Sequence, residues 1–289
     1  MIRKVNSIHE GDPVHWVGDG FRMKNYFPGS MNFGKRISPF FLLDYHPPYE
    51  YPPVEQPRGV GVHPHKGFET VTIAFEGAVA HHDSRGGEGV IRPGDVQWMT
   101  AGNGILHKEY HEAEFSRKGG RMKMLQLWVN LPAKFKAVEP KYQAITRAEM
   151  GEIAFGKGSK ITLIAGEKDG IRGPASTFTP IHLWTVDMRA GDSFVADLPE
   201  HFNTAVLLTE GEMELTDGHM VRNNDFILYE NKGTEIRIEA VADSHFVLLS
   251  GEPIDEPVVH YGPFVMNNIQ EIHEAIRDFQ AGKFGVLED

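Results

Sequence analysis

Cysteine is absent from this sequence of 289 residues, and its absence narrows the chemistry that the chain can perform. Disulfide bonds, cysteine nucleophiles and thiolate metal sites are all excluded. Any bound metal must therefore be held mainly by histidine, aspartate and glutamate side chains. The sequence contains 15 histidines, which is enough to supply such a site.

Long apolar runs are also missing. No segment approaches the roughly 20 apolar residues that a membrane-spanning helix needs. No apolar run follows Arg3 and Lys4 near the start, as a secretory signal would require. We therefore expect a cytoplasmic protein without a membrane partner.

Basic residues are fewer than acidic ones. The chain has 29 Lys and Arg against 40 Asp and Glu, which gives a formal net charge of −11. Nucleic-acid affinity depends on basic side chains that neutralise phosphates, so direct nucleic-acid binding is disfavoured.

Short strand-like segments recur along the chain. In residues 70–75, Val71, Ile73 and Phe75 alternate with polar side chains, and a Glu-Gly turn signal follows. Similar segments occupy residues 122–129, 160–165, 182–188, 204–208, 226–229, 235–239 and 245–249. This pattern predicts an all-β fold built from barrels or sandwiches. The length favours two domains, and a proline-bearing stretch at residues 132–140 places them at 1–135 and 136–289.

One helix is predicted near the C-terminus. Asn268 can cap it, and Glu271 stands three residues later, as in a capping box. Ile269, Ile272, Ile276 and Phe279 form an apolar stripe at helical spacing before Gly282. We expect this face to pack on a barrel rather than to take part in catalysis.

The two halves share a loose pattern that indicates an internal duplication. A Glu-Gly turn at 76–77 is followed by Asp95, and a Glu-Gly turn at 210–211 is followed by Asp225. Aligning the turns places Asp197 opposite His63 and Arg237 opposite His107. On this alignment the second copy lacks metal ligands.

Two pairs of potential ligands lie in the first half. The segment Gly61-Val62-His63-Pro64-His65 places two imidazoles at i and i+2, which on a strand project from the same face. The segment Ile105-Leu106-His107-Lys108-Glu109 repeats the spacing with a histidine and a carboxylate. Three imidazoles and one carboxylate suit a divalent transition metal and can leave coordination positions open.

These motifs resemble the two cupin motifs in the form found in the pirin family. The resemblance rests on His63-Pro64-His65-Lys66-Gly67-Phe68-Glu69 and on the segment from Val90 through Gly94 and Gly104 to Glu109. Leu125-Gln126-Leu127-Trp128 and the segment Gly262-Pro263-Phe264-Val265-Met266-Asn267 also match in order and spacing. The resemblance implies two cupin-type β-barrel (jelly-roll) domains with a C-terminal helix.

The family pattern also implies a ligand set. His63, His65, His107 and Glu109 would bind one divalent metal, usually Fe(II), with Mn, Ni, Cu, Zn and Co as alternatives. The second domain would be cupin-like and without metal. Glu69 is a rival carboxylate that the family pattern disfavours. The nearby His81, His82 and His111 are expected to be surface residues or neighbours of the site.

Other residues near the motifs have ordinary explanations. Gly94, Gly102 and Gly104 belong to no phosphate-binding motif and are expected to form turns. Trp98, Met99 and Phe68 can line a cavity, although buried aromatic residues in a barrel are ordinarily packing residues.

The resemblance implies two functions that share one site. The first is a metal-dependent dioxygenase that opens a flavonol such as quercetin, with Glu109 as both ligand and general base. The alternative is an iron-binding regulatory protein that acts through protein-protein contacts. We expect a monomer in either case.

Overall fold

The computed structural model describes residues 1–288, of which most form β-structure. Strands account for 52% of the chain and helices for 9%, so the predicted all-β class with a C-terminal helix is confirmed. No helix within these residues is long and apolar enough to cross a membrane.

The chain divides into two compact units, and neither is continuous in sequence. The first barrel comprises Pro13–Pro28, Phe40–Arg147 and the chain from Ile254 onward, and the second barrel comprises Met1–Asp12, Gly29–Pro39 and Ala148–Pro253. The predicted division between residues 135 and 136 separates the sequence at one point. In the structure, however, the N-terminal segment belongs to the second barrel and the C-terminal segment to the first. The C-terminal helix consequently belongs to the first barrel and not to the second.

Within the described chain, the first barrel contains a seven-stranded sheet, a four-stranded sheet and a two-stranded ribbon. In spatial order the large sheet is β12 (Lys141–Ile145), β9 (Val96–Thr100), β6 (Phe68–Glu76), β11 (Gly120–Asn130), β4 (Phe40–Tyr51), β3 (Phe21–Phe27) and β2 (His15–Val17). The small sheet is β5 (Gly59–His65), β10 (Ile105–His111), β7 (Val79–Asp83) and β8 (Glu88–Ile91), and the ribbon is β25 (Val259–Tyr261) and β26 (Phe264–Met266). Its short helices are α1 (Ala113–Lys118) and η2 (Ala133–Phe135), and η3 (Arg147–Glu149) spans the boundary between the two units in the sequence.

The second barrel repeats this architecture of seven, four and two strands in residues 1–288. Its large sheet is β1 (Val5–His9), β22 (Phe226–Tyr229), β19 (Asn203–Glu210), β24 (Ser244–Gly251), β17 (Ile181–Met188), β14 (Ser159–Ala165) and β13 (Gly151–Phe155). Its small sheet is β18 (Ser193–Asp197), β23 (Glu235–Ala240), β20 (Glu212–Leu215) and β21 (Met220–Arg222), its ribbon is β15 (Glu167–Lys168) and β16 (Ile171–Arg172), and it also contains η1 (Gly34–Arg36). Every segment predicted as a strand from its sequence lies within one of these strands.

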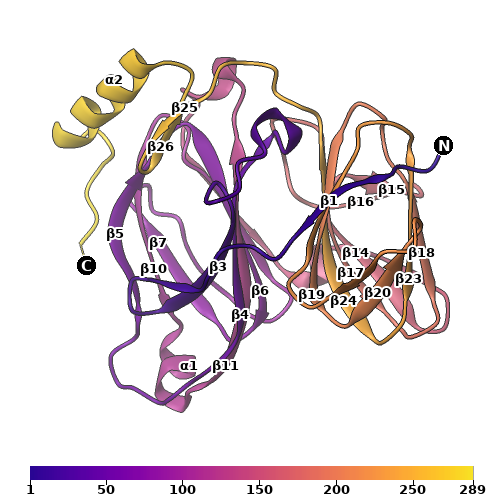
Figure 1. Ribbon diagram of the computed structural model, residues 1–289. Helices are drawn as coiled ribbons and strands as arrows, with labels where there is room; N and C mark the ends of the chain where they lie inside the picture. Colours follow the sequence, from indigo (N-terminus) through magenta and orange to yellow (C-terminus); the bar gives the residue numbers. More distant parts are fainter. Residues whose placement is uncertain (289) are drawn as a thin grey trace. The chain divides into compact units, whose positions relative to one another are not determined.

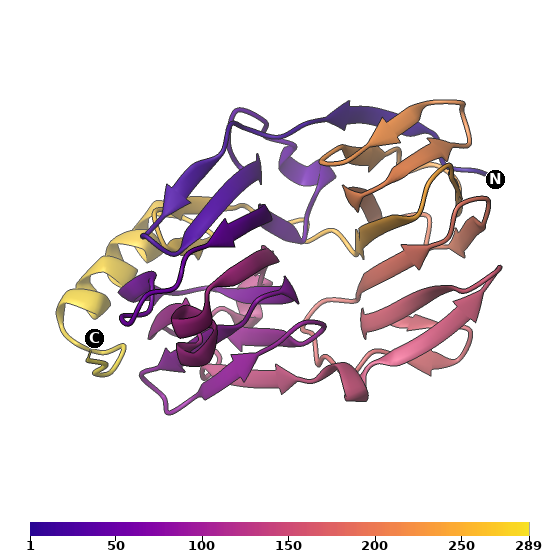
Figure 2. The ribbon, with the colours of Figure 1, turned by 90° about the horizontal axis from the view of Figure 1, so that it is seen from below.

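The N-terminal strand joins the second barrel by extending its large sheet. Ile8 and His9 of β1 pair in antiparallel register with Ile227 and Phe226 of β22. Figure 2 shows the indigo β1 running beside the orange strands of this sheet. This pairing connects residues more than 200 positions apart, which strand periodicity along the sequence cannot reveal.

The predicted C-terminal helix is α2 (Ile269–Gln280), and its predicted cap is confirmed. The Asn268 side chain accepts a hydrogen bond from the Glu271 N–H at 3.0 Å and donates one to the Glu271 carboxylate at 2.8 Å. Ile272 is buried in a small core with Phe264 and Phe284, against which Leu106 of β10 packs. Of the predicted apolar stripe, Ile269 and Phe279 remain 49% and 41% exposed, so the buried face is narrower than the sequence pattern. The helix lies beside the β25–β26 ribbon (Figure 1).

Equivalent turns support the predicted duplication. In the first barrel the Asp95 carboxylate accepts a hydrogen bond from the Arg92 N–H at 3.0 Å. In the second barrel Asp225 accepts one from the Arg222 N–H at 2.8 Å. Each aspartate also donates its own N–H to the carbonyl of the same arginine. The two turns therefore have the same construction at corresponding places.

The turn alignment is nevertheless shifted by one residue along β18 and β23. Arg237 and Asp197, which it placed opposite His107 and His63, are exposed. The interior positions of these strands are apolar and include Ile236, Ile238, Phe194 and Ala196. Because a shift of one residue exchanges the two faces of a strand, the interior counterparts of the histidines are hydrophobic. These positions offer the second barrel no nitrogen or oxygen ligand.

Candidate metal centre

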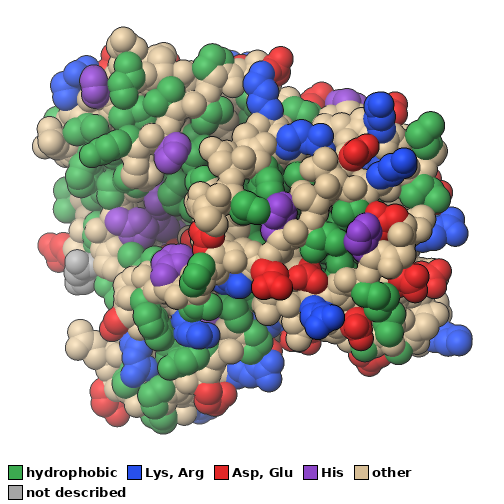
Figure 3. All heavy atoms as spheres, in the orientation of Figure 1, with side chains coloured by type: hydrophobic (Ala, Val, Ile, Leu, Met, Phe, Trp, Pro, Cys, Tyr) green, Lys and Arg blue, Asp and Glu red, His purple; other side chains and the backbone are tan. Residues whose placement is uncertain are grey.

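Two neighbouring strands of the first barrel bring three histidines together. On β5 and β10, His107 lies directly opposite His63, and Ile105 lies opposite His65. The ring centroids are 4.2 Å apart for His63 and His107, 4.8 Å for His65 and His107, and 4.9 Å for His63 and His65. One nitrogen from each ring falls within 4.8 Å of the other two. Histidine side chains gather over this small sheet (Figure 3).

Burial keeps two of these imidazoles neutral. His65 is 5% exposed and His107 is fully buried. Burial is the main cause that lowers the pKa of each well below its ordinary value, and the neighbouring histidines lower it further. Neutral imidazole is the form that ligates a metal.

The ring nitrogens are arranged to accept a cation. His63 donates its Nδ1 proton to the Gly61 carbonyl at 2.8 Å, which leaves the lone pair of Nε2 available. His65 Nδ1 and His107 Nε2 are buried without a hydrogen-bond partner. Converging neutral nitrogens of this kind suit a divalent transition metal, so the residues fit the ion that the sequence motifs imply.

Glu109 lies next to this cluster but outside the set of three. One oxygen of its carboxylate lies within 4.8 Å of a ring nitrogen of His107 and of one of His81. It does not form such a set with all of His63, His65 and His107. Three side chains donate to it: Gln97, Gln126 at 3.0 Å and Thr72 at 3.4 Å. Glu109 is 4% exposed, and its three donors fix the orientation of the carboxylate.

The donors to Glu109 come from one row of the large sheet. Gln126 of β11 pairs with Thr72 of β6, and Thr72 pairs with Gln97 of β9, so the three side chains share a face. The row faces inward, because Glu109 on the opposing sheet is its common acceptor. Gln97 and Gln126 could not be predicted as site residues from the sequence, since they meet only through the register of three strands.

His81 and Asp83 also belong to this interior, as neighbours of the histidine cluster. His81 is fully buried and approaches His107 with an Nδ1–Nδ1 distance of 3.4 Å. Its Nε2 is 3.2 Å from the Asp83 carboxylate. Burial raises the pKa of Asp83, but hydrogen bonds from His81 and from the N–H groups of Arg85 and Gly87 outweigh this effect and lower it overall.

The other polar residues near the motifs point elsewhere. Glu69 pairs with Thr100 in the large sheet and accepts a hydrogen bond from its hydroxyl at 2.7 Å. It lies on the face of β6 opposite to Thr72, because adjacent faces alternate and the two residues are three positions apart. His82 is exposed, and His111 donates to the Gly20 carbonyl at 2.7 Å.

Aromatic rings form a wall beside His65. Trp128 lies 5.2 Å from His65 and 4.2 Å from Phe68 between ring centroids. Phe41 stacks on Trp128 at 6.5 Å with an interplanar angle of 13°. From the sequence, Trp98 is considered a residue that could line a cavity. It pairs with Val71, whose side chain lies on the face of β6 opposite to the inward-facing Thr72, so Trp98 also lies on that opposite face.

The loop that follows β5 is anchored by the C-terminal segment. The Lys66 N–H donates to the Pro263 carbonyl at 3.3 Å, and the Lys66 ammonium forms an ion pair with Asp278 at 2.9 Å. The buried Lys136 ammonium donates to the carbonyls of Gly67 and Val265, each at 2.7 Å. These contacts fix the strand end that carries His65.

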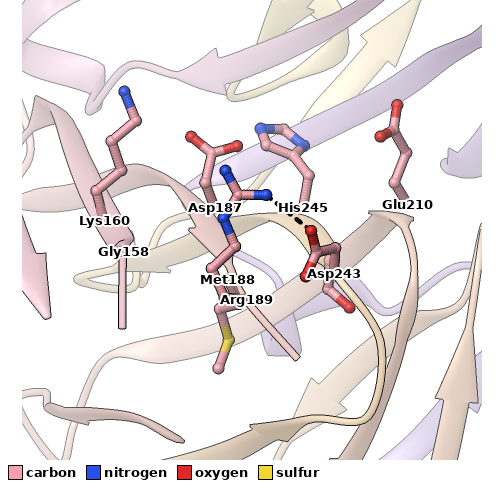
Figure 4. A pocket seen from close by; sticks show the side chains of 9 residues that line it. Gly158, Lys160, Asp187, Met188, Arg189, Glu210, Asp243 and His245 are labelled. Carbon is pink, nitrogen blue, oxygen red and sulfur yellow. Dashed lines mark hydrogen bonds and ion pairs between the residues drawn. The ribbon is translucent and has the colours of Figure 1, made fainter. Parts of the chain in front are cut away.

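A different hollow lies in the second barrel. It has a volume of about 470 Å³ and is lined by Lys160, Asp187, Arg189, Glu210, Asp243 and His245, among others. The Arg189 guanidinium points to the Asp243 carboxylate and forms an exposed ion pair at 2.7 Å (Figure 4). Its side chains form a solvated charged surface rather than a converging ligand set.

Comparison with known proteins agrees with this architecture. The Pirin family model matches residues 20–129, and the model for the Pirin C-terminal cupin domain matches residues 183–285. A Pseudomonas aeruginosa relative named "Putative quercetin 2,3-dioxygenase" is 44% identical over 284 residues, covering 98% of this chain and 99% of its own. Pirin-like protein 2 of Arabidopsis thaliana is 39% identical over 265 residues, covering 87% and 77%.

A solved structure is equally similar. The crystal structure of an Acinetobacter baumannii protein named quercetin 2,3-dioxygenase superposes with a TM-score of 0.96 at 44% identity, covering both chains completely. The predicted fold of two cupin domains is thereby confirmed. This chain belongs to the pirin family.

Proposed function

We propose that this protein is a metal-dependent dioxygenase that opens a flavonol such as quercetin. In this proposal His63, His65, His107 and Glu109 hold one divalent metal, with Fe(II) as the physiological ion. The observation that carries the proposal is the convergence of three imidazoles beside a fixed, buried carboxylate. The names of the Pseudomonas and Acinetobacter relatives support the choice of substrate.

The metal, when bound, would supply a Lewis acid that favours the ionised form of a substrate hydroxyl and a centre at which dioxygen can react. Glu109 would receive the proton that the flavonol hydroxyl gives up. Its three hydrogen-bond donors hold the carboxylate in place, so little reorganisation is needed for this transfer.

The aromatic wall suits a planar substrate. Trp128 and Phe41 are half-buried and nearly parallel, and Trp128 borders His65. Flat aromatic rings bind well against such surfaces through offset stacking. The wall would align a flavonol ring system beside the metal.

The proposal is tested by metal analysis and by quercetin absorbance under air. The Fe(II) form should remove the flavonol absorbance band, and the metal-free protein should not. Glu109→Gln should reduce the rate at least tenfold while the protein stays folded. Glu69→Gln is the matched control, because this carboxylate faces away from the site, and it should retain most of the rate. Loss of the band at equal rates with and without metal would refute the proposal.

A further inference from the structure

A chain of hydrogen bonds leads from a carboxylate to the ring of His107. Asp83 is 3.2 Å from His81 Nε2, and His81 Nδ1 is 3.4 Å from His107 Nδ1. All three side chains are buried, with Asp83 5% exposed and both histidines fully enclosed. Buried polar atoms keep such partners because water cannot replace them.

When both imidazoles are neutral, the chemistry of the three groups fixes the direction of each hydrogen bond. An ionised carboxylate can only accept, so His81 must donate from Nε2 to Asp83. A neutral His81 then has a bare Nδ1, which accepts a proton from Nδ1 of His107. A neutral His107 that is protonated at Nδ1 has its lone pair on Nε2, which is the buried nitrogen without a partner.

We infer that Asp83 and His81 are positioning residues for the metal centre, because they hold His107 in the tautomer that presents a bare Nε2. The inference rests on the metal site of the proposed function, but not on flavonol chemistry. Carboxylate–histidine pairs behind a ligating imidazole orient it and increase its basicity. Here the pair acts through a second imidazole.

Further contacts hold both Asp83 and His81 in place. The Asp83 carboxylate also accepts hydrogen bonds from the N–H groups of Arg85 at 2.8 Å and Gly87 at 2.9 Å, which prevents it from turning away. The His81 ring stacks on Tyr142 with centroids 4.8 Å apart and an interplanar angle of 16°. These contacts leave the His81 ring no freedom to rotate toward another partner.

A competing interpretation is that His81 is itself a metal ligand, since one of its ring nitrogens lies within 4.8 Å of a nitrogen of His107 and an oxygen of Glu109. Its hydrogen bonds argue against that role. Nε2 faces Asp83, and Nδ1 faces His107, so each ring nitrogen already has a partner. A metal bound at His81 Nδ1 would require the hydrogen bond with His107 to break.

The direct test is nitrogen-15 NMR of the metal-free protein, which reports the tautomer of each histidine without any catalytic readout. We expect His107 to be protonated at Nδ1 and His81 at Nε2, with the signals assigned by their loss in His107→Gln and His81→Phe. A His107 protonated at Nε2 in the wild-type protein would overturn the inference. This measurement requires no activity, so it is independent of whether quercetin is the substrate.

Asp83→Asn provides the matched perturbation. The introduced amide oxygen can still accept from the two N–H groups of the turn, while its NH₂ now donates to His81 Nε2. Both tautomers should reverse, which places a proton on His107 Nε2 and lowers metal affinity by roughly 10- to 100-fold at unchanged stoichiometry. The control is Asp95→Asn, because the Asp95 carboxylate also accepts hydrogen bonds from two backbone N–H groups, those of Arg92 and Arg147, and these come from arginines rather than from a histidine.

His81→Phe separates positioning from ligation, because it keeps a ring against Tyr142 but removes both nitrogens. We expect one metal per chain with weakened affinity and a Co(II) absorption spectrum of unchanged coordination number. A complete loss of metal binding, or a Co(II) spectrum with one ligand fewer, would show that His81 is itself a ligand and would overturn the inference. Unchanged affinity in both Asp83→Asn and His81→Phe would overturn it as well.

Discussion

His63 and His107 lie directly opposite each other across β5 and β10, with their ring centroids 4.2 Å apart. This pair joins the two motifs, which are separated by more than 40 residues in the sequence. His65 completes the cluster from the same strand as His63. The candidate metal site is therefore a property of one strand pair and of the register between its members.

The first prediction concerns metal content. His63→Ala and His107→Ala should each reduce bound metal from one equivalent per chain to well below half, because a three-histidine set loses a third of its nitrogen donors. Elemental analysis of purified protein measures this directly. His82→Ala is the control, since His82 lies on the neighbouring strand but is exposed. Full occupancy in both ligand variants would refute the ligand assignment.

The second prediction concerns the amide donors to Glu109. Gln97 is fully buried and donates to the Glu109 carboxylate. Gln97→Leu should lower the free energy of unfolding of the metal-free protein by about 2 kcal/mol, because a buried charged group loses a hydrogen bond. Urea denaturation measures the change.

A double-mutant cycle provides the control for this interaction. In a Glu109→Gln background, Gln97→Leu should cost clearly less than in the wild-type protein, since the charge is no longer present. Equal costs in the two backgrounds would mean that the amide stabilises something other than the carboxylate.

Much of the site could be predicted from sequence because its pattern is local. The i and i+2 spacing of His63 with His65 and of His107 with Glu109 follows from strand geometry alone. Gln97 and Gln126 could not be predicted in the same way, because they meet Glu109 only through the pairing of β9, β6 and β11.

The limits of the fold prediction have the same cause. Helical spacing and the capping box identify α2 as an element but do not say which barrel it joins, and residues 5–9, which form β1, are not among the predicted strands. That assignment depends on contacts more than 150 residues apart, such as the pairing of β1 with β22 and the ion pair of Lys66 with Asp278. In the duplicated half, a shift of one residue was enough to place Arg237 in the interior by alignment, although it is exposed in the structure.

The third prediction concerns Lys136, whose ammonium group donates to three buried oxygens. These are the Gly67 carbonyl, the Asn130 side chain and the Val265 carbonyl, each at 2.7 Å. Lys136→Met should lower the free energy of unfolding by about 3 kcal/mol, because the three acceptors lose their donor. Hydrogen exchange should also quicken at the Val265 amide, which pairs with the Lys66 carbonyl. Lys134→Met is the exposed control and should change neither quantity by much.

The last prediction is a pH dependence that arises from Glu69. This side chain is 1% exposed, and burial raises its pKa from 4.5 to about 7. Between these two pH values the folded protein holds a proton that the unfolded chain has lost. The free energy of unfolding therefore falls as pH rises through this window, by roughly 3 kcal/mol in total if the shift is fully expressed.

Glu69→Gln should remove that slope, because an amide does not ionise. Relative to the wild-type protein, the variant should gain stability above pH 7 and should gain none below pH 4.5. Urea denaturation of metal-free protein at pH 4.5, 6 and 8 measures the difference, and Glu139→Gln serves as an exposed control. A stability difference between variant and wild type that stays constant across the three pH values would show that the pKa of Glu69 is the same in the folded and unfolded states. Quercetin turnover by the Fe(II) form should change little in the same variant, because the hydrogen bond from Thr100 holds this side chain on the face of β6 that points away from Glu109.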